Sequence, residues 1–530
     1  MIAGQGTKTH KGISFSEKDL ISLLGLRFPD SEFFEKMAGM PGSRNTHLLA
    51  ERYNQDALDI VETFRKGRPG GLGVGMSTGK ETIYFNGTLI EEDLTDFLEM
   101  INGPALRKQA GIPSLGSMSM CNPPPYGQFD RFTHMVAAYH VTKHLCNKLG
   151  IEGDRRNLIL AYALCHDIGH LVYGHSGEDN FKYKHHKKKN GFDHERTAKL
   201  LIRQEQEGFE SVLRDLGEKL IDLFEERNND HQIVTADLGG SDRLGYMGAD
   251  PSQLGISTEF DPIGYIAHLN FDGETMWCDS AEKAAKFFLQ WAKGYQRLYY
   301  GSLNQASGAY TKKILHRAGF KDVNDPIPLG ENEDSLDRPL WQANNYQLVR
   351  YLCTQHPDEM VRAMARYWLL GFHSSPLTTV AVLKRPGYER CEGRVQVHDF
   401  ERLTFKERYP RSEGVDPEML GAWYQRGRHP DDQDEKERII AERLEIPNHL
   451  MTLAASPHTD KFLSQRAAIQ EGKRGPRQEL FVMEGGRYVQ PVKEVFNEIQ
   501  GLRLCVHPQI WDETYRKLGR SPLARILREA

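Results

Sequence analysis

The sequence predicts a mainly α-helical protein, and three observations support this prediction. From about residue 129, apolar residues recur at three- and four-residue steps, the spacing that buries one face of a helix. Period-two alternation, which is typical of a half-buried strand, is scarce in the same region. Strand-like segments occur in the C-terminal part, at QELFVM and LRLCVHP. We therefore expect minor β content there.

Residues 1–120 are predicted to form an N-terminal helical extension. Two helical patches indicate it: residues 17–28 (EKDLISLLGLRF) and 91–101 (EEDLTDFLEMI). The glycine-rich stretch 67–82 between them predicts a loop or turn. Its GMSTGKE portion resembles a phosphate-binding loop. That interpretation fails because Val74 stands where such a loop needs glycine, and Glu81 stands where it needs a Ser or Thr.

Residues 121–325 are predicted to form a helical core. Four segments have the helical pattern: 129–149, 157–170, 194–213 and 281–303. The acidic, proline-containing stretch 322–339 predicts a boundary or an exposed connector. Residues 326–530 then form a mixed, mostly helical C-terminal region, which is a candidate for oligomerisation or regulation.

Composition excludes several classes of protein. The formal net charge of −5 gives no global case for nucleic-acid binding, so any affinity for polyanions must be local. The basic run KYKHHKKK (182–189) is either a solvated loop or a guide for polyphosphate or nucleic acid. The seven cysteines are scattered and predict free thiols in a reducing compartment. No stretch reaches the roughly 18 apolar residues of a membrane helix, so we expect a cytoplasmic protein without a membrane partner.

A histidine-aspartate pair, His166-Asp167, lies in the stretch LCHDIGHLVYGHSGED. It follows the apolar segment LILAYAL, where a buried charge must be paired or must bind a cation. The chain has a second such pair, His398-Asp399, which has no supporting histidines close by. The first pair is therefore the candidate for chemistry.

Imidazole and carboxylate together suit Mn, Fe, Zn, Ni or Co, provided that several ligands converge from separate elements. His134 on the preceding helix can supply one imidazole to His166 and Asp167. Asp242, at the start of a helical turn, is the candidate fourth ligand, although Asp237 is an alternative and aspartate is also an ordinary N-cap. Two histidines and two aspartates leave positions open for water and a substrate oxygen, as catalytic metal sites require.

Five motifs follow one another in the chain at compatible spacings. They are R-x-x-H (Arg131, His134), H-D-x-x-H-x-x-x-x-H (His166, Asp167, His170, His175), D-H-E (Asp193, His194, Glu195), D-R-x-x-Y-x-x-x-D followed by L-G-I (Asp242 to Ile256), and KGYQRLYYGSLN (293–304). In this order the chain resembles the HD-domain deoxynucleoside triphosphate triphosphohydrolases, most of all the branch that includes the vertebrate enzyme with a sterile alpha motif. The resemblance covers about residues 125–320. It implies an HD-domain helical core with N- and C-terminal additions.

The resemblance also implies roles for individual residues. The metal ligands would be His134, His166, Asp167 and Asp242. The triphosphate would be held by Arg131, Arg243 and Tyr246, and the sugar hydroxyl would be read by Asp250. The histidines near the scissile α-phosphate would be His170, His175 and His194, with Glu178 as the acidic partner of the catalytic His194. Arg243 replaces a lysine of the vertebrate branch, and Gly245 replaces a bulkier acidic residue.

The expected reaction is metal-dependent hydrolysis of a dNTP to a deoxynucleoside and inorganic triphosphate, by attack of water on the α-phosphate. Mn or Mg would support it best. The resemblance further implies a homo-oligomer and a nucleotide effector. Two alternatives remain open at this point: hydrolysis of a different nucleotide or nucleic-acid end at the same metal site, and a nucleotide-regulated oligomeric binding protein.

Overall fold

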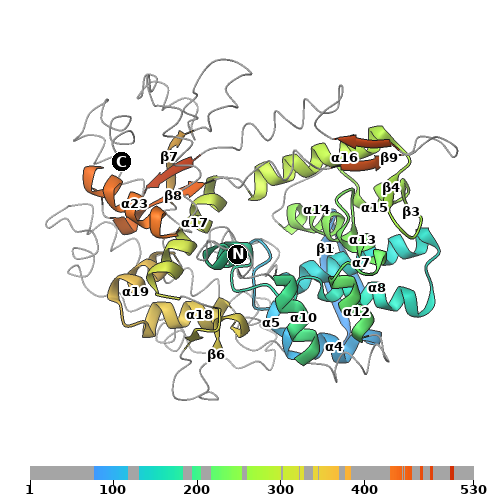
Figure 1. Cartoon of the computed structure of the whole chain (residues 1–530), viewed down its shortest axis with the longest axis horizontal. Coiled ribbons are helices and arrows are strands. Elements are labelled where there is room, and N and C mark those ends of the chain that lie inside the picture. Colours follow the sequence, from blue (N-terminus) through green and yellow to red (C-terminus); the bar gives the residue numbers. More distant parts are fainter. Residues whose placement is uncertain are drawn as a thin grey trace, which may run out of the picture.

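The structure is a computed structural model. The residues that it describes are 77–116, 130–182, 194–204, 217–253, 259–299, 302–320, 323–327, 338–343, 345–368, 377–383, 430–444, 446, 448–455, 466–469, 478–481 and 502–506. Helices dominate these residues, and the strands form small sheets, which confirms the mainly α prediction. Figure 1 shows α7, α8, α10 and α12 to α16 gathered on one side and α17, α18, α19 and α23 on the other.

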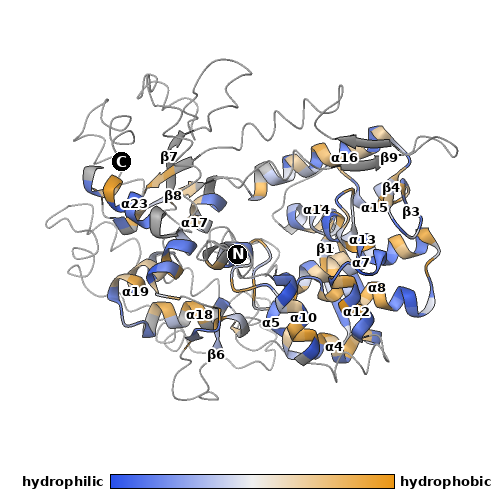
Figure 2. Cartoon of the chain, in the orientation of Figure 1, coloured by the Kyte–Doolittle hydropathy of each residue, from blue (hydrophilic) through white to orange (hydrophobic). Residues whose placement is uncertain are grey.

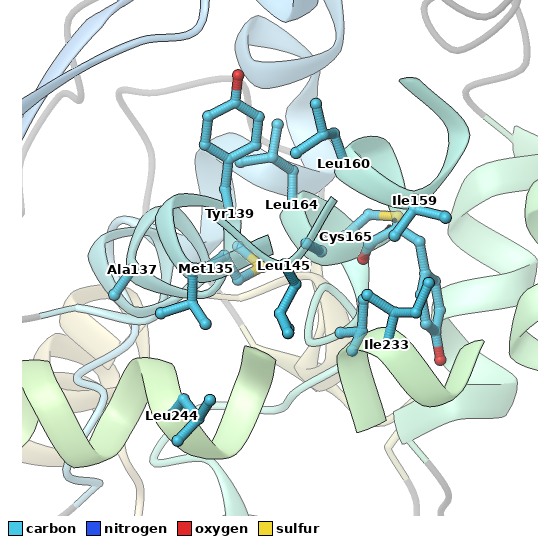
Figure 3. Packing of buried hydrophobic residues seen from close by; sticks show 14 of the residues in the cluster. Met135, Ala137, Tyr139, Leu145, Ile159, Leu160, Leu164, Cys165, Ile233 and Leu244 are labelled. Carbon is cyan, nitrogen blue, oxygen red and sulfur yellow. Dashed lines mark hydrogen bonds between the residues drawn. The ribbon is translucent and has the colours of Figure 1, made fainter. Parts of the chain in front are cut away.

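The centre of the helical core is α7 (Arg131–Leu149), which packs against α8 (Gly153–Cys165) and α14 (Ser241–Gln253). Helix α7 begins at a true N-cap, since the Asp130 carboxylate accepts a hydrogen bond from the Thr133 amide at 2.8 Å. It ends at Gly150, whose φ of 64° is the left-handed conformation of a helix C-cap. Buried side chains fill the space between these helices (Figure 3). Both ends of the central helix are thus set by its own sequence.

Further helices surround this centre. They are α9 (His175–Lys182), α10 (His194–Gln204), α12 (Gly217–Phe224), α13 (Gln232–Thr235), α15 (Pro262–Ile266), α16 (Ala281–Gly294) and α17 (Ser302–Arg317). A five-residue π-helical turn, Tyr295–Tyr299, follows α16. Figure 2 shows that the helices carry apolar residues on one face and hydrophilic residues on the other, as the three- and four-residue spacing predicts. The four segments predicted as helical form helices in their described parts, except that α8 ends at Cys165 and residues 166–170 are not helical.

The N-terminal part differs from the prediction. A hairpin of β1 (Lys80–Phe85) and β2 (Thr88–Asp93) replaces the start of the helix predicted over 91–101, and α4 covers only Leu98–Asn102. The reason is the turn Asn86-Gly87, whose positive φ values of 47° and 78° suit a two-residue hairpin. The prediction of a helix is therefore wrong for the first residues of 91–101, which belong to β2. The predicted helix at 17–28 lies outside the described residues.

The hairpin belongs to the main hydrophobic core. Ile83 and Phe85 are buried in the same cluster as the apolar side chains of α7 and α8. Helix α5 (Pro104–Gln109) joins that cluster through Leu106. The structure agrees with the rejection of a phosphate-binding loop, because Lys80 begins a strand and its amino group pairs with Glu91 at 3.1 Å. The N-terminal part described here is thus packed onto the helical core.

The C-terminal region adds helices, and it contributes strands to three of the small sheets. Its helices are α18 (Asn345–Arg350), α19 (Glu359–Arg366) and α23 (Pro430–Leu444). One sheet has the order β7 (Thr378–Leu383), β11 (Leu502–Val506), β8 (Met451–Ala455). Another has the order β10 (Gln478–Phe481), β9 (Arg466–Ile469), β4 (Met276–Cys278), β3 (Leu269–Phe271). A third pairs β5 (Pro326–Ile327) with β6 (Arg338–Pro339). The strands predicted at QELFVM and LRLCVHP are confirmed, as β10 and β11.

A buried ion pair connects the core to the C-terminal region. The Lys313 ammonium of α17 lies 2.6 Å from the Glu437 carboxylate of α23, and both side chains are almost fully buried. Lys313 also donates to the carbonyl oxygens of Asn448 and Met451, at 2.5 and 2.8 Å. Thr452 donates to the other Glu437 oxygen at 2.8 Å. Because both charges are paired and hydrogen-bonded, this contact fixes α23 and β8 on α17.

The structure tests the predictions about cysteines, membrane helices and the basic run only in the residues that it describes. The cysteines of the described part, Cys146, Cys165, Cys278, Cys353 and Cys505, are free and buried. Within the described ranges no helix is both long and apolar enough to cross a membrane. Residues 183–189 of the basic run and the pair His398-Asp399 lie outside those ranges.

Candidate metal centre

Three helices bring the candidate ligands together. His134 lies in the first turns of α7, His166-Asp167 directly follows α8, and Asp242 is the second residue of α14. Helices α7 and α14 approach closely because position 245 is glycine: a Cβ there would lie 3.0 Å from the Ala138 amide nitrogen. The departure from a bulkier residue at this position therefore has a packing reason.

The four side chains converge on one another. His134 Nε2 lies 3.3 Å from Asp167 Oδ2 and 3.1 Å from Asp242 Oδ1. His166 Nε2 lies 3.6 Å from Asp167 Oδ1 and 3.3 Å from Asp242 Oδ1. The side chains of the histidines and Asp167 are at most 12% exposed, whereas that of Asp242 is 29% exposed. The cluster is therefore enclosed, with its most accessible side at Asp242.

This arrangement fits a divalent cation. Ligand atoms about 2.0 to 2.2 Å from one ion, at tetrahedral or octahedral angles, lie about 2.8 to 3.6 Å from each other. The four distances fall in that range. His166 Nδ1 lies 2.9 Å from the Ala163 carbonyl oxygen, which can only accept, so Nδ1 carries the proton and Nε2 keeps its lone pair for the cluster. Two imidazoles and two carboxylates are a suitable donor set for such an ion.

The charges of the cluster favour a cation in the same place. Burial alone would lower the pKa of His134, but the Asp167 and Asp242 carboxylates raise it to about 10. Burial alone would raise the pKa of Asp167, yet His166, His170 and Arg131 hold it well below its usual range. Two ionised carboxylates thus meet at a buried point, where positive charge compensates them.

Asp237, the alternative ligand, lies elsewhere. Its carboxylate pairs with the Arg243 guanidinium, and its side chain is 49% exposed. Arg243 also donates to the Asp237 carbonyl oxygen at 2.8 Å and lies over the Trp291 ring, 4.6 Å from its centroid. Between the two aspartates, the geometry favours Asp242 as the ligand.

A second polar cluster adjoins the first and centres on Glu178, which has no exposed surface. Its carboxylate contacts His170 Nδ1 and lies 3.2 Å from His175 Nδ1 and 3.5 Å from His194 Nδ1. Burial would raise the pKa of Glu178, but His170 and the other two imidazoles lower it well below its usual range. His170 Nε2 lies 3.1 Å from Asp167 Oδ1, so the two clusters touch.

The imidazoles of the second cluster differ in exposure. His170 is buried and stacks on His194, with ring centroids 4.3 Å apart. The side chains of His175 and His194 are 62% and 23% exposed. The sequence pairs Glu178 with His194; the structure adds His170 and His175 as partners of the same carboxylate. An acid or base at His194 would therefore have both a fixed orientation and a path to solvent.

The remaining predicted residues lie on α14. Asp242, Tyr246 and Asp250 are four residues apart and share one face of the helix. The Tyr246 hydroxyl accepts a hydrogen bond from the Trp291 indole, and the Tyr299 hydroxyl donates to the Asp250 carboxylate. Burial raises the pKa of Asp250 to about 6. The face of α14 that carries Asp242 thus continues through Tyr246 and Asp250. Tyr246, Trp291 and Tyr299 form an aromatic wall along this face.

Arg131 lies at the junction of both clusters, where its guanidinium donates to Asp167 Oδ2 at 2.9 Å. Sequence reasoning missed other groups beside it. From α5, Lys108 donates to the His170 carbonyl oxygen at 2.9 Å and Gln109 donates to that of Ile168 at 2.6 Å. No motif marks these two side chains. The contacts of Trp291 and Tyr299 were also missed, although Tyr299 lies within the last motif.

Comparison with known proteins agrees with this geometry. Residues 131–253 match the family model of the HD domain. The chain therefore contains an HD domain. All twelve residues discussed as site candidates, from Arg131 to Asp250, lie within that domain. Within that domain, His134, His166 and Asp167 form a group that could hold a metal ion.

Relatives of known sequence match only part of the chain. Two uncharacterised proteins, from Mycoplasma pneumoniae and Mycoplasma genitalium, are each 25% identical over 33% and 32% of this chain, and the matches cover 45% and 42% of their own lengths. A deoxyguanosinetriphosphate triphosphohydrolase-like protein from Caulobacter vibrioides is 38% identical over 64 residues, which are 12% of this chain and 15% of that protein. The matches with the two Mycoplasma proteins thus span less than half of those proteins.

Solved structures match a larger share of this chain than the relatives of known sequence do. A phosphohydrolase from Bacteroides thetaiotaomicron has a TM-score of 0.51 and 18% identity, covering 78% of this chain and 95% of that chain. A hypothetical protein from Aquifex aeolicus has a TM-score of 0.53 and 14% identity, covering 83% and 100%. The TM-scores show a common fold, and at these identities they show the fold alone. The homo-oligomer and the nucleotide effector stay predictions.

Proposed function

We propose that the protein hydrolyses deoxynucleoside triphosphates to a deoxynucleoside and inorganic triphosphate, by attack of water on the α-phosphorus. The observation that carries the proposal is the contact between the two polar clusters, Asp167 Oδ1 to His170 Nε2 at 3.1 Å. The contact supports the proposal because the cluster around Glu178, to which the candidate proton donor His194 belongs, adjoins the candidate metal site. The ordered motifs and the Caulobacter relative favour a dNTP as the substrate.

The chain's own residues can perform the other parts of the reaction. A bound divalent ion would polarise a phosphoryl oxygen and orient the attacking water. Arg131, fixed on Asp167 at the junction, supplies positive charge for the oxyanion that develops on phosphorus. His194, held by Glu178 and partly open to solvent, protonates the leaving 5′-oxygen. The expelled deoxynucleoside and triphosphate account for all atoms of the substrate and one water.

Recognition of the nucleoside is assigned to α14. Asp250 Oδ1 is buried and has no hydrogen-bond partner among the described residues, so it can accept a hydrogen bond from a sugar hydroxyl. Tyr246 packs between the candidate metal ligand His134, at a ring distance of 6.4 Å, and Tyr299, at 6.0 Å. Arg243 provides a second cation near the same wall and suits bidentate contacts with phosphate oxygens.

Incubation with each dNTP in Mn²⁺ or Mg²⁺, followed by ion-exchange chromatography, tests this reaction. We expect equal amounts of deoxynucleoside and inorganic triphosphate from at least one dNTP, and no turnover after chelation of the metal. Release of orthophosphate or pyrophosphate without triphosphate would contradict the proposal. Deoxynucleoside monophosphates, cyclic nucleotides and single-stranded oligonucleotides, run in parallel, would show whether another phosphoester is the substrate.

A further inference from the structure

The loop between the two polar clusters has an unusual backbone. It joins His170 to α9 and contains Tyr173, whose φ is 62°, followed by Gly174 at 53°. A bulky residue in the left-handed region costs about 1 to 3 kcal/mol and persists only where its surroundings hold it. Tyr173 is almost fully buried. Some contact outside the loop must therefore stabilise this conformation.

Contacts from distant parts of the chain stabilise the left-handed conformation of Tyr173. The Tyr173 amide donates to Asn345 Oδ1 at 2.8 Å, across 172 residues of sequence. Asn345 is buried at the start of α18, and its backbone N–H donates to the Gly111 carbonyl oxygen at 3.1 Å. The Tyr173 ring packs edge-on against Trp368, with centroids 4.5 Å apart. A side chain of the C-terminal region thus satisfies the backbone of a loop in the HD domain.

Lys108 fixes the other end of the loop. Its ammonium donates to the His170 carbonyl oxygen at 2.9 Å and to the Trp341 carbonyl oxygen at 2.5 Å. Trp341 lies in the short turn Leu340–Gln342, just before Asn345. Residues on both sides of the HD domain in sequence therefore meet at this loop.

The loop conformation sets the position of two groups of the site. A Cβ at Gly174 would lie 2.8 Å from Arg131 Nη2, so the guanidinium that holds Asp167 rests against this glycine. The Glu178 amide donates to the Gly174 carbonyl oxygen at 3.1 Å, so the loop also fixes the first turn of α9. A shift of the loop would move Arg131 and Glu178 together.

We propose that Asn345 is a positioning residue of the HD-domain site: its side chain holds the Tyr173-Gly174 backbone in the left-handed conformation that places Arg131 and Glu178. The role in turnover rests on the proposed function, whereas the role in loop conformation does not. The C-terminal region is thereby a working part of the site, because the HD domain alone lacks this side chain.

Three variants of the full chain test the proposal. Asn345→Ala removes the acceptor, and Asn345→Asp keeps an oxygen in its place. Leu348→Ala removes a fully buried side chain from the same helix and leaves Asn345 in place. Amide hydrogen exchange of residues 170–178, followed by mass spectrometry, reports loop opening. Thermal melting and dNTP hydrolysis complete the comparison.

Asn345→Ala should speed exchange of residues 170–178 by about 10-fold, the effect of losing one buried hydrogen bond. It should lower kcat by about 10- to 100-fold through misplacement of the catalytic groups. Asn345→Asp should restore much of both, and Leu348→Ala should lower the melting temperature while kcat stays near wild type. Unchanged loop exchange in Asn345→Ala, or equal loss of kcat in Leu348→Ala, would overturn the proposal. If the wild-type chain hydrolyses no dNTP, the proposed function fails while the exchange comparison still decides the role of Asn345.

Discussion

Replacement of Asp167 by asparagine is expected to remove the bound divalent ion and to lower hydrolysis by more than about 100-fold, since loss of groups that merely support a metal ligand already costs about 10- to 100-fold. The Asp167 carboxylate contacts the candidate ligands His134 and His166. It also accepts a hydrogen bond from Arg131 and lies beside His170. Metal content per chain, measured by elemental analysis on purified protein, gives a readout that does not depend on the substrate.

The aspartates of the α13–α14 region provide the matched control. Asp242→Asn should lose the metal, whereas Asp237→Asn should keep it, because Asp237 pairs with Arg243 instead of the histidines. Both side chains are partly exposed, so neither change should prevent folding. Loss of metal from Asp237→Asn alone would show that the ligand set has been assigned wrongly.

Replacement of His194 by alanine is expected to lower kcat by about 10²- to 10⁴-fold, the range for a general acid or base, while the metal content stays at the wild-type level. Its imidazole faces the buried Glu178 carboxylate at 3.5 Å and stacks on His170. Single-turnover hydrolysis of the best dNTP, at saturating metal, measures the effect on the chemical step.

His144 serves as the control for this histidine. It lies exposed on α7, and its ring contacts His140. His144→Ala should leave turnover unchanged. The prediction for His194 would be wrong if His194→Ala retained wild-type kcat, or if it lost the metal together with its activity.

Much of the candidate site could be predicted from the sequence because ordered motifs with fixed spacing carry it. His134, His166 and Asp167 lie in segments that the apolar periodicity predicts as helical, and Asp242 begins a motif. The structure brings the Nε2 atom of each histidine within 3.6 Å of both aspartates. The choice between Asp242 and Asp237 needed coordinates. They lie five residues apart, and their contacts separate them: Asp242 faces His134 and His166, whereas Asp237 pairs with Arg243.

The contacts that the sequence could not predict are long-range. Lys108 and Asn345 reach the site from 62 and 172 residues away along the chain, and neither belongs to a motif. The hairpin at 80–93, by contrast, had a local signal, because Asn86-Gly87 between apolar segments is typical of a two-residue hairpin turn. The helical periodicity of residues 91–101 nevertheless predicted a helix over the whole segment, whose first residues lie in β2.

Hydrolysis of a dNTP in water enriched in ¹⁸O tests the central claim most directly. Attack on the α-phosphorus breaks the bond between phosphorus and the 5′-oxygen, so one ¹⁸O atom should enter the inorganic triphosphate and none should enter the deoxynucleoside. Mass spectrometry of both products measures this. Label in the deoxynucleoside, or in released orthophosphate or pyrophosphate, would contradict the account.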